Sequence, residues 1–124
     1  MTIPEFFGEL IAVQTFTKLH HLAVSKVTGS YATHMALNSF YEDLQDLTDG
    51  LIESCQGKHG VVKNIVVKSV STSVPVIEKL KAFAKMLEMC GVFGEKDENS
   101  FIYNQIDEIT TLTYQTIYKL ENLQ

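Results

Sequence analysis

His34 and four carboxylates that follow it are the residues whose types and spacing could bind a metal ion. The carboxylates are Glu42, Asp46, Asp49 and Glu53, separated by four, three and four residues, which places them in one row along a helix. Imidazole and carboxylate ligands together suit iron, manganese or zinc. Like charges in such a row repel each other. Two interpretations stay open: water and counter-ions screen the row, or a metal ion or a basic partner neutralises it.

A single helix cannot bring His34 and the later carboxylates onto one ion. At about 1.5 Å of rise per residue, His34 and Asp49 lie roughly 22 Å apart along the helix axis. A second chain running antiparallel across a two-fold axis could place His34 of one subunit against Asp49 and Glu53 of the other. The predicted site is therefore shared between subunits and requires a homo-oligomer.

Two further histidines come before the predicted turn between the first two helices. His20 and His21 lie before this turn and His34 lies after it, so an antiparallel helix pair makes the two histidine-bearing segments neighbours. His20 falls on the apolar stripe of its helix, where a core histidine without a ligand role is the alternative interpretation. The candidate metal ligands are thus His20, His21, His34, Asp49 and Glu53.

The first two elements that must position these ligands are predicted to be amphipathic helices. Thr2 can cap the first helix, whose apolar stripe runs through His20 to Val27, and the helix is predicted to end near Gly29. The second helix is predicted from about Tyr31 to Cys55, with Gly57 and Gly60 stopping it. Its predicted buried stripe consists of Leu37, Tyr41, Leu44, Leu51 and Cys55.

The second half of the chain contains an extended connection and two more helices. The stretch "GVVKNIVVKSVSTSV" is rich in β-branched residues and predicts an extended crossover or a short strand. The third helix is predicted to start at Ser73 and Pro75 and to close at Gly91. The fourth is predicted to bury Phe101, Ile102, Ile106, Ile109, Thr113, Ile117 and Leu120. The predicted fold is all-α: a ferritin-like four-helix bundle with one long extended crossover between helices 2 and 3, as a single domain over residues 1–124.

Composition and charge disfavour several classes of function. The chain has 124 residues, a net charge of −5 and no arginine, which argues against bidentate recognition of phosphate or guanine. The only basic stretch is residues 58–74, which carry Lys58, Lys63 and Lys68 and no acid, so nucleic-acid binding is not expected. Cys55 and Cys90 are predicted to be reduced thiols. No segment resembles a membrane span or a signal peptide, which predicts a cytoplasmic protein.

The segment "HHLAVSKVTGSYATHMALNSFYEDLQDLTDGLIE" resembles the first two helices of Dps-type miniferritins. In that resemblance His34 corresponds to the second ferroxidase histidine, Asp49 and Glu53 to the later acidic pair, and His21 or His20 to the first histidine. Asn38 stands where the family carries its nearer aspartate. The resemblance implies an oligomer that binds iron or another divalent metal between subunits. Because an amide is a poorer ligand for a hard cation, ferroxidase turnover is not favoured.

A second resemblance gives the alternative function. The stretch "YATHMALNSFYEDLQDLTDGLIESCQGKHG" is similar to small uncharacterised proteins of tailed bacteriophages. The function of those proteins is not established. Together with Asn38 and the acidic row, the resemblance suggests a non-catalytic phage module, located in the host cytoplasm, that engages a host protein or sequesters a small molecule. Tyr103, Tyr114 and Tyr118 could share one side of the last helix as a contact surface, or they could belong to the edge of the core or a subunit contact.

Overall fold

The computed structural model describes residues 1–24 and 30–123 and contains four helices. These are α1 (Ile3–Ala23), α2 (Tyr31–His59), α3 (Val76–Glu88) and α4 (Ser100–Asn122). No strand occurs in this described part of the chain. The all-α prediction is confirmed, and the segment between α2 and α3 is an extended crossover rather than a strand.

The helix starts follow local sequence signals. Thr2 is the N-cap of α1, where its hydroxyl oxygen accepts a hydrogen bond from the backbone N–H of Glu5 at 3.2 Å. Ser30 caps α2 in the same way, accepting from the N–H of Thr33 at 3.1 Å. Each cap satisfies one of the backbone donors that a helix leaves unpaired at its start.

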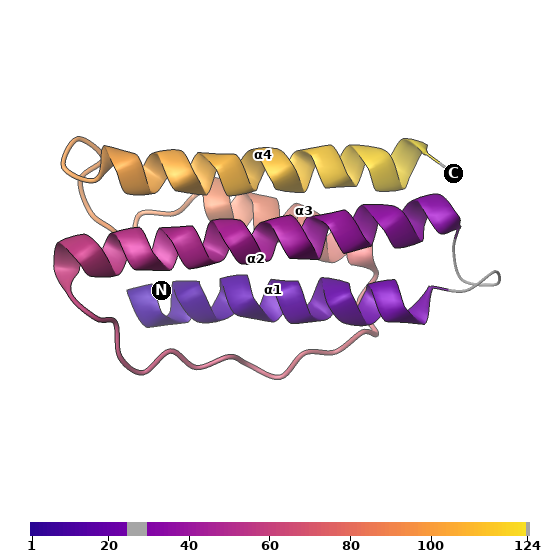
Figure 1. The fold of residues 1–124 in the computed structure, drawn as a ribbon, viewed down its shortest axis with the longest axis horizontal. Helices are drawn as coiled ribbons and strands as arrows, with labels where there is room; N and C mark the ends of the chain where they lie inside the picture. Colours follow the sequence, from indigo (N-terminus) through magenta and orange to yellow (C-terminus); the bar gives the residue numbers. More distant parts are fainter. Residues whose placement is uncertain (25–29, 124) are drawn as a thin grey trace.

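The helices form a bundle around one hydrophobic core. Helix α1 packs against α2, α2 against α4, and α4 against α3. A smaller contact between α1 and α3 completes the bundle. Figure 1 shows the crossover running alongside α1 from the end of α2 to the start of α3. The largest fully buried side chains are Phe6, Phe7, Leu10, Leu37, Phe40, Leu44, Leu51, Leu80, Ile102, Ile106 and Ile109.

The ends of the first two helices differ from the prediction. Helix α1 ends at Ala23, with Val24 as an extended C-cap, so it does not continue through Val24; the predicted end near Gly29 and the apolar position Val27 lie outside the described residues. Helix α2 continues past Cys55 to His59 and stops where Gly60 adopts a φ of 90°. Only glycine adopts such a φ without strain, so Gly60 ends the helix.

The predicted buried stripes are largely correct, although His20, Val24 and Leu120 are only half-buried and two further positions, Tyr41 and Phe101, also differ. Tyr41 is half-buried because it lies at the border of α2 that faces the end of α1. Phe101 is 39% exposed. Its ring lies at the surface under the ammonium group of Lys58, 5.4 Å from the ring centroid. Both residues have helical spacing to the core, so spacing alone could not separate an edge position from a central one.

The crossover lies directly against α1 at Gly8. The backbone carbonyl of Val66 occupies the space that a Cβ atom at position 8 would need. Val62 and Ile65 pack against the core on either side of an exposed pair, Lys63 and Asn64. The absence of a side chain at Gly8 thus lets the connection lie directly on the helix.

Among the described residues, no helix is both long and apolar enough to cross a lipid bilayer.

Candidate histidine site between helices α1 and α2

Two of the predicted ligands, His21 and His34, lie face to face. His21 is in the last turn of α1 and is 7% exposed, whereas His34 is in the first turn of α2 and is half-buried. Their ring centroids are 3.8 Å apart and the ring planes differ by 26°. The antiparallel packing of α1 on α2 therefore brings together two imidazoles that are thirteen residues apart in the sequence.

Each of these histidines is held by the backbone of the other. Nδ1 of His21 lies 2.8 Å from the carbonyl oxygen of His34, and Nδ1 of His34 lies 3.2 Å from the carbonyl oxygen of His21. Because a carbonyl only accepts, both Nδ1 atoms carry the proton and donate it. In the neutral rings, Nε2 then keeps its lone pair. No hydrogen bond to either Nε2 is seen in the described part of the chain.

The hydrogen bonds at Nδ1 fix the tautomer and orientation of both rings. Histidines that bind metals commonly donate their other ring N–H to a carbonyl, which fixes the tautomer and the ring orientation. His21 and His34 both meet this condition. The two side chains are pre-oriented by the fold and are not free surface rotamers.

Aromatic and amide side chains support the pair. The ring of Tyr41 lies edge-on to His21, with centroids 5.4 Å apart. Its hydroxyl donates a 3.0 Å hydrogen bond to Oδ1 of Asn38. On the other side Tyr31, which is 77% exposed, stacks on His34 at 6.3 Å. Asn38 therefore positions Tyr41, a role that the sequence alone did not indicate.

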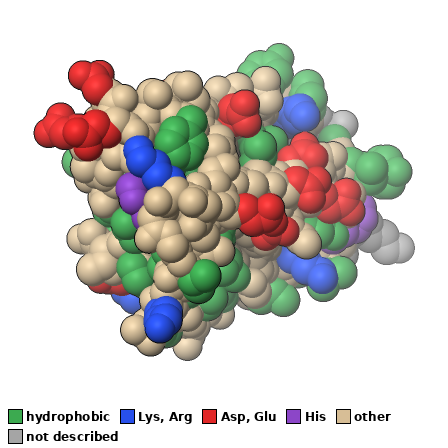
Figure 2. Space-filling model, turned by 60° about the vertical axis from the view of Figure 1, so that its left-hand side comes forward, with side chains coloured by type: hydrophobic (Ala, Val, Ile, Leu, Met, Phe, Trp, Pro, Cys, Tyr) green, Lys and Arg blue, Asp and Glu red, His purple; other side chains and the backbone are tan. Residues whose placement is uncertain are grey.

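The other predicted ligands are not part of this pair. His20 packs on Phe16 with ring centroids 4.5 Å apart, and its Nε2 is shielded from solvent without a partner in the described structure. Asp49 and Glu53 are exposed farther along the same continuous helix. In Figure 2 several acidic side chains lie next to one another on the right-hand part of the face, others stand out at the upper left, and histidine side chains are visible at the left and near the right edge. Within the described residues, no three His, Cys, Asp or Glu side chains converge on one point.

Lys58 and His59 are tied to the start of α4. Asn99, which is 4% exposed, accepts hydrogen bonds at Oδ1 from Nζ of Lys58 at 3.2 Å and from Nε2 of His59 at 3.1 Å. Its Nδ2 donates to the carbonyl oxygens of Phe93 at 2.8 Å and Glu95 at 3.2 Å. Sequence reasoning missed Asn99, because nothing in the sequence marks an asparagine before a helix as buried.

Neither thiol is activated as a nucleophile. Cys55 is buried, and burial raises the pKa of its thiol above the usual value. Burial also raises the pKa of Cys90, against smaller lowering effects of a backbone hydrogen bond at Val92 and the charge of Lys96. Both thiols therefore stay protonated near neutral pH, whereas the deprotonated thiolate is the reactive form.

Comparison with known proteins gives a family without an assigned activity. Residues 25–120 match the family described as "Family of unknown function (DUF5856)". A search of curated proteins finds no significant match, and neither does a search of solved structures.

Proposed function

We propose that this chain, which belongs to the DUF5856 family of unknown function, is a Dps-like homo-oligomer that binds a divalent metal ion at an intersubunit site. The single observation that supports this most is the reciprocal pairing of His21 and His34, which gives two oriented imidazoles whose Nε2 atoms make no hydrogen bond to the described residues. Iron, manganese and zinc are the ions that suit imidazole combined with carboxylate.

The order of helix contacts supports a ferritin-like assignment. Helices α1 and α2 form one antiparallel hairpin, α3 and α4 form another, and the extended crossover joins them along the length of the bundle. A four-helix bundle with one long crossover is the connectivity of ferritin-like folds. The proposed ligands then all lie on the first hairpin, as in the Dps resemblance.

A second copy is needed to complete the site. One chain supplies His21 and His34, whereas Asp49 lies roughly 22 Å farther along α2 by helix rise. In an antiparallel dimer built on α2, Asp49 and Glu53 of the second copy would approach this histidine pair. A bound ion would neutralise part of the acidic row, and His21 and His34 of one copy and Asp49 and Glu53 of the other would be its ligands.

The proposed metal ligands favour binding of a metal ion over catalytic oxidation of iron. If the ion is iron, it is the substrate of a ferroxidase-type oxidation, in which ferrous iron loses an electron to dioxygen or peroxide. Asn38 supplies a neutral amide where the miniferritin pattern has a carboxylate, and its Oδ1 already accepts from Tyr41. We therefore propose metal binding as the function and do not assign an enzymatic activity.

Metal content and mass in solution test the proposal directly. Protein purified without a histidine tag or chelator should be a dimer or larger by light scattering and should carry about half to one ion per chain by elemental analysis. His34→Ala should lose the ion, and so should the surface variant Asp49→Asn with Glu53→Gln. The control is Asp43→Asn, which removes one carboxylate charge at a position about 120° around α2 from Asp49 and should keep the metal.

Mixed subunits test whether the site is shared. Randomly mixed dimers of the His34→Ala chain and the Asp49→Asn, Glu53→Gln chain should regain roughly a quarter of the wild-type metal, because each heterodimer keeps one intact site of two. If the site instead lay within one chain, the mixed dimers would regain no metal. Unchanged metal content in both single-chain variants would refute the proposed ligands.

Replacing Asn38 by aspartate should strengthen metal binding. The change adds a carboxylate one turn after His34, beside the histidine pair, and restores the charge that the amide lacks. We expect the dissociation constant for Mn²⁺ or Zn²⁺ to fall on the order of tenfold, as measured by isothermal titration calorimetry. Ser39→Asp, which adds the same charge at the exposed neighbouring position, is the control and should leave the constant nearly unchanged. Equal effects of the two substitutions would show that charge alone is responsible.

The second candidate function, a phage module that binds a host protein, is favoured by one surface of α4. Tyr114 and Tyr118 are 48% and 60% exposed, and Leu123 is 46% exposed. Tyr103 does not join them, because it is 8% exposed and its hydroxyl donates to the carbonyl of Gly94 at 2.8 Å. A host-protein pulldown that is abolished by Tyr114→Ala with Tyr118→Ala, while metal content is unchanged, would support this candidate over the first.

A further inference from the structure

A cleft lies between α1, the end of the crossover and the start of α3. Its volume is about 280 Å³. Ala12 and Phe16 of α1 form one apolar wall, and Val70 and Val74 of the crossover form another. Pockets that hold drug-sized ligands measure about 300–1,000 Å³, so this cleft suits a smaller molecule with an apolar body.

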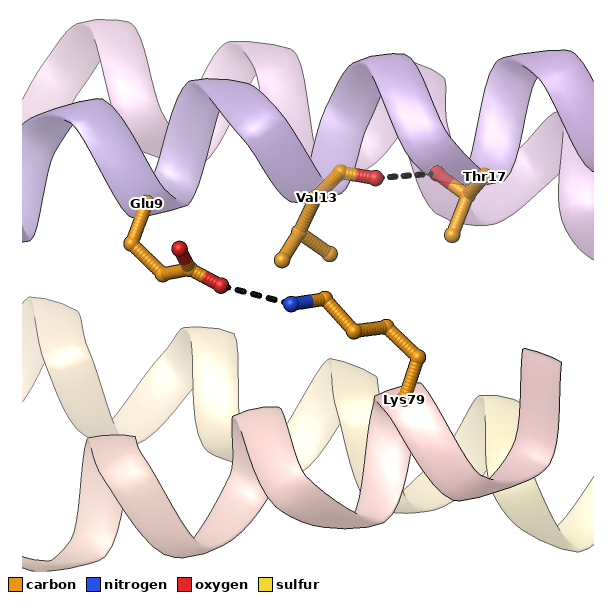
Figure 3. Close-up of polar contacts among 4 residues, drawn as sticks. All are labelled: Glu9, Val13, Thr17 and Lys79. Atoms are coloured by element: carbon orange, nitrogen blue, oxygen red, sulfur yellow. Dashed lines mark hydrogen bonds and ion pairs between the residues drawn. The ribbon is translucent and has the colours of Figure 1, made fainter. Parts of the chain in front are cut away.

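The charged groups of the cleft leave one cation without a partner. Nζ of Lys79 is 2.9 Å from Oε1 of Glu9, and Figure 3 shows these two side chains reaching toward each other from α3 and α1. This ion pair neutralises both residues. Lys68, which also lines the cleft, makes no ion pair or hydrogen bond with the described residues. The lining therefore has an excess of one positive charge.

Backbone donors lie beside this lysine. Ser69, Val70 and Ser71 line the cleft, and their backbone N–H groups make no hydrogen bond within the described parts of the chain. An ammonium group and an unpaired backbone N–H beside it together favour an anion. Because residues 61–71 are extended, successive N–H groups point to opposite sides, and only alternate ones can face the cleft. The Ser71 hydroxyl, 2.8 Å from that of Ser73, adds a further polar group at the same place.

We propose that this cleft binds a small carboxylate with an apolar tail, such as a medium-chain fatty acid. The tail would lie against Phe16, Ala12, Val70 and Val74, and the carboxylate would accept from Lys68 and from those N–H groups of residues 69–71 that face the cleft. One net positive charge complements one carboxylate, and the apolar walls exclude a purely ionic ligand. This site is separate from the histidine pair, because none of the five proposed metal ligands lines it.

Titration with octanoate tests the proposal on the whole chain in the presence of a chelator, so that its outcome is independent of metal binding. Two-dimensional ¹H–¹⁵N spectra should show saturable shifts at residues 69–71 and around Phe16. Affinity should rise about fourfold with each added methylene from butanoate until the cleft is full. Octan-1-ol, which lacks the charge, should bind more weakly.

Matched variants locate the carboxylate and the tail. Lys68→Gln should weaken octanoate binding by about threefold to tenfold, whereas Lys63→Gln, on the same crossover but outside the lining, should not. Val74→Trp should abolish binding by filling the cleft, and since Val74 is already 40% exposed, the helical circular dichroism should be retained. Equal weakening by the two lysine variants, equal binding of octanol, or no saturable shift at millimolar octanoate would overturn the proposal.

Discussion

Asn99→Ala is expected to lower the free energy of unfolding by about 2–4 kcal/mol, because a buried amide with four hydrogen bonds is removed. Two of these bonds join the end of α2 to the start of α4, and two hold the turn that precedes α4. The substitution leaves the carbonyl of Phe93 without its partner. Buried polar groups that lose their partner account for much of such a cost.

Chemical denaturation in urea measures this effect. Asn104→Ala is the control, since Asn104 is exposed on α4 near the same end of the bundle, and we expect a change within about 0.5 kcal/mol. His59→Ala should give a smaller loss than Asn99→Ala, because it removes one of the four bonds. If Asn99→Ala and Asn104→Ala have the same stability, the hydrogen bonds of Asn99 contribute nothing net to the fold.

Two helical glycines should respond to alanine with opposite signs. Gly8→Ala is expected to destabilise the protein by about 1–3 kcal/mol, because the new methyl group overlaps the carbonyl of Val66 and the crossover must move. Gly50→Ala is the matched control on α2, where nothing lies within 4 Å of the new Cβ atom. It should stabilise by about 0.5–1 kcal/mol, since alanine favours helix over glycine.

The same urea experiment separates the two glycines, and a ¹H–¹⁵N spectrum shows where the chain moves. In Gly8→Ala the shifts should extend to residues around Val66, which are 58 positions away in the sequence. In Gly50→Ala they should remain within α2. Stabilisation by Gly8→Ala would mean that the crossover does not rest on α1 in solution.

The helical elements could be predicted from the sequence because their signals are local. Thr2 caps α1 and Gly60 ends α2 by chemistry confined to a few neighbouring residues. The end of α1 at Ala23 could not be predicted in this way, since the apolar spacing continues to Val24 and the chain nevertheless leaves the helix there. Likewise, Phe101 has core spacing but lies under Lys58, a contact between residues 43 positions apart.

The sequence predicted that the histidines of α1 and α2 lie near each other, but not how their rings are arranged. Sequence spacing left His20 and His21 as equal alternatives, because both lie one helical turn from the hairpin. The structure distinguishes them through the rotation of α1 on α2: the ring of His21 faces His34, and that of His20 faces Phe16. The support of Tyr41 by Asn38 and the four bonds of Asn99 depend on side-chain packing across helices, which spacing along one helix does not encode.

The crossover is also the segment where we expect proteases to cleave the folded chain. Residues 61–70 are extended, mostly exposed, and make no backbone hydrogen bonds to one another or to other described residues apart from the bond of the Val62 N–H to Gln56. Proteases cleave such exposed segments more readily than helices, and Lys63 and Lys68 give trypsin two cleavage points there. A short digestion should therefore separate the chain into its two helical hairpins, α1–α2 and α3–α4, which stay associated through the core. We therefore expect the α1–α2 and α3–α4 fragments to remain folded together after the crossover is cut, because their association depends on the core and not on the covalent connection.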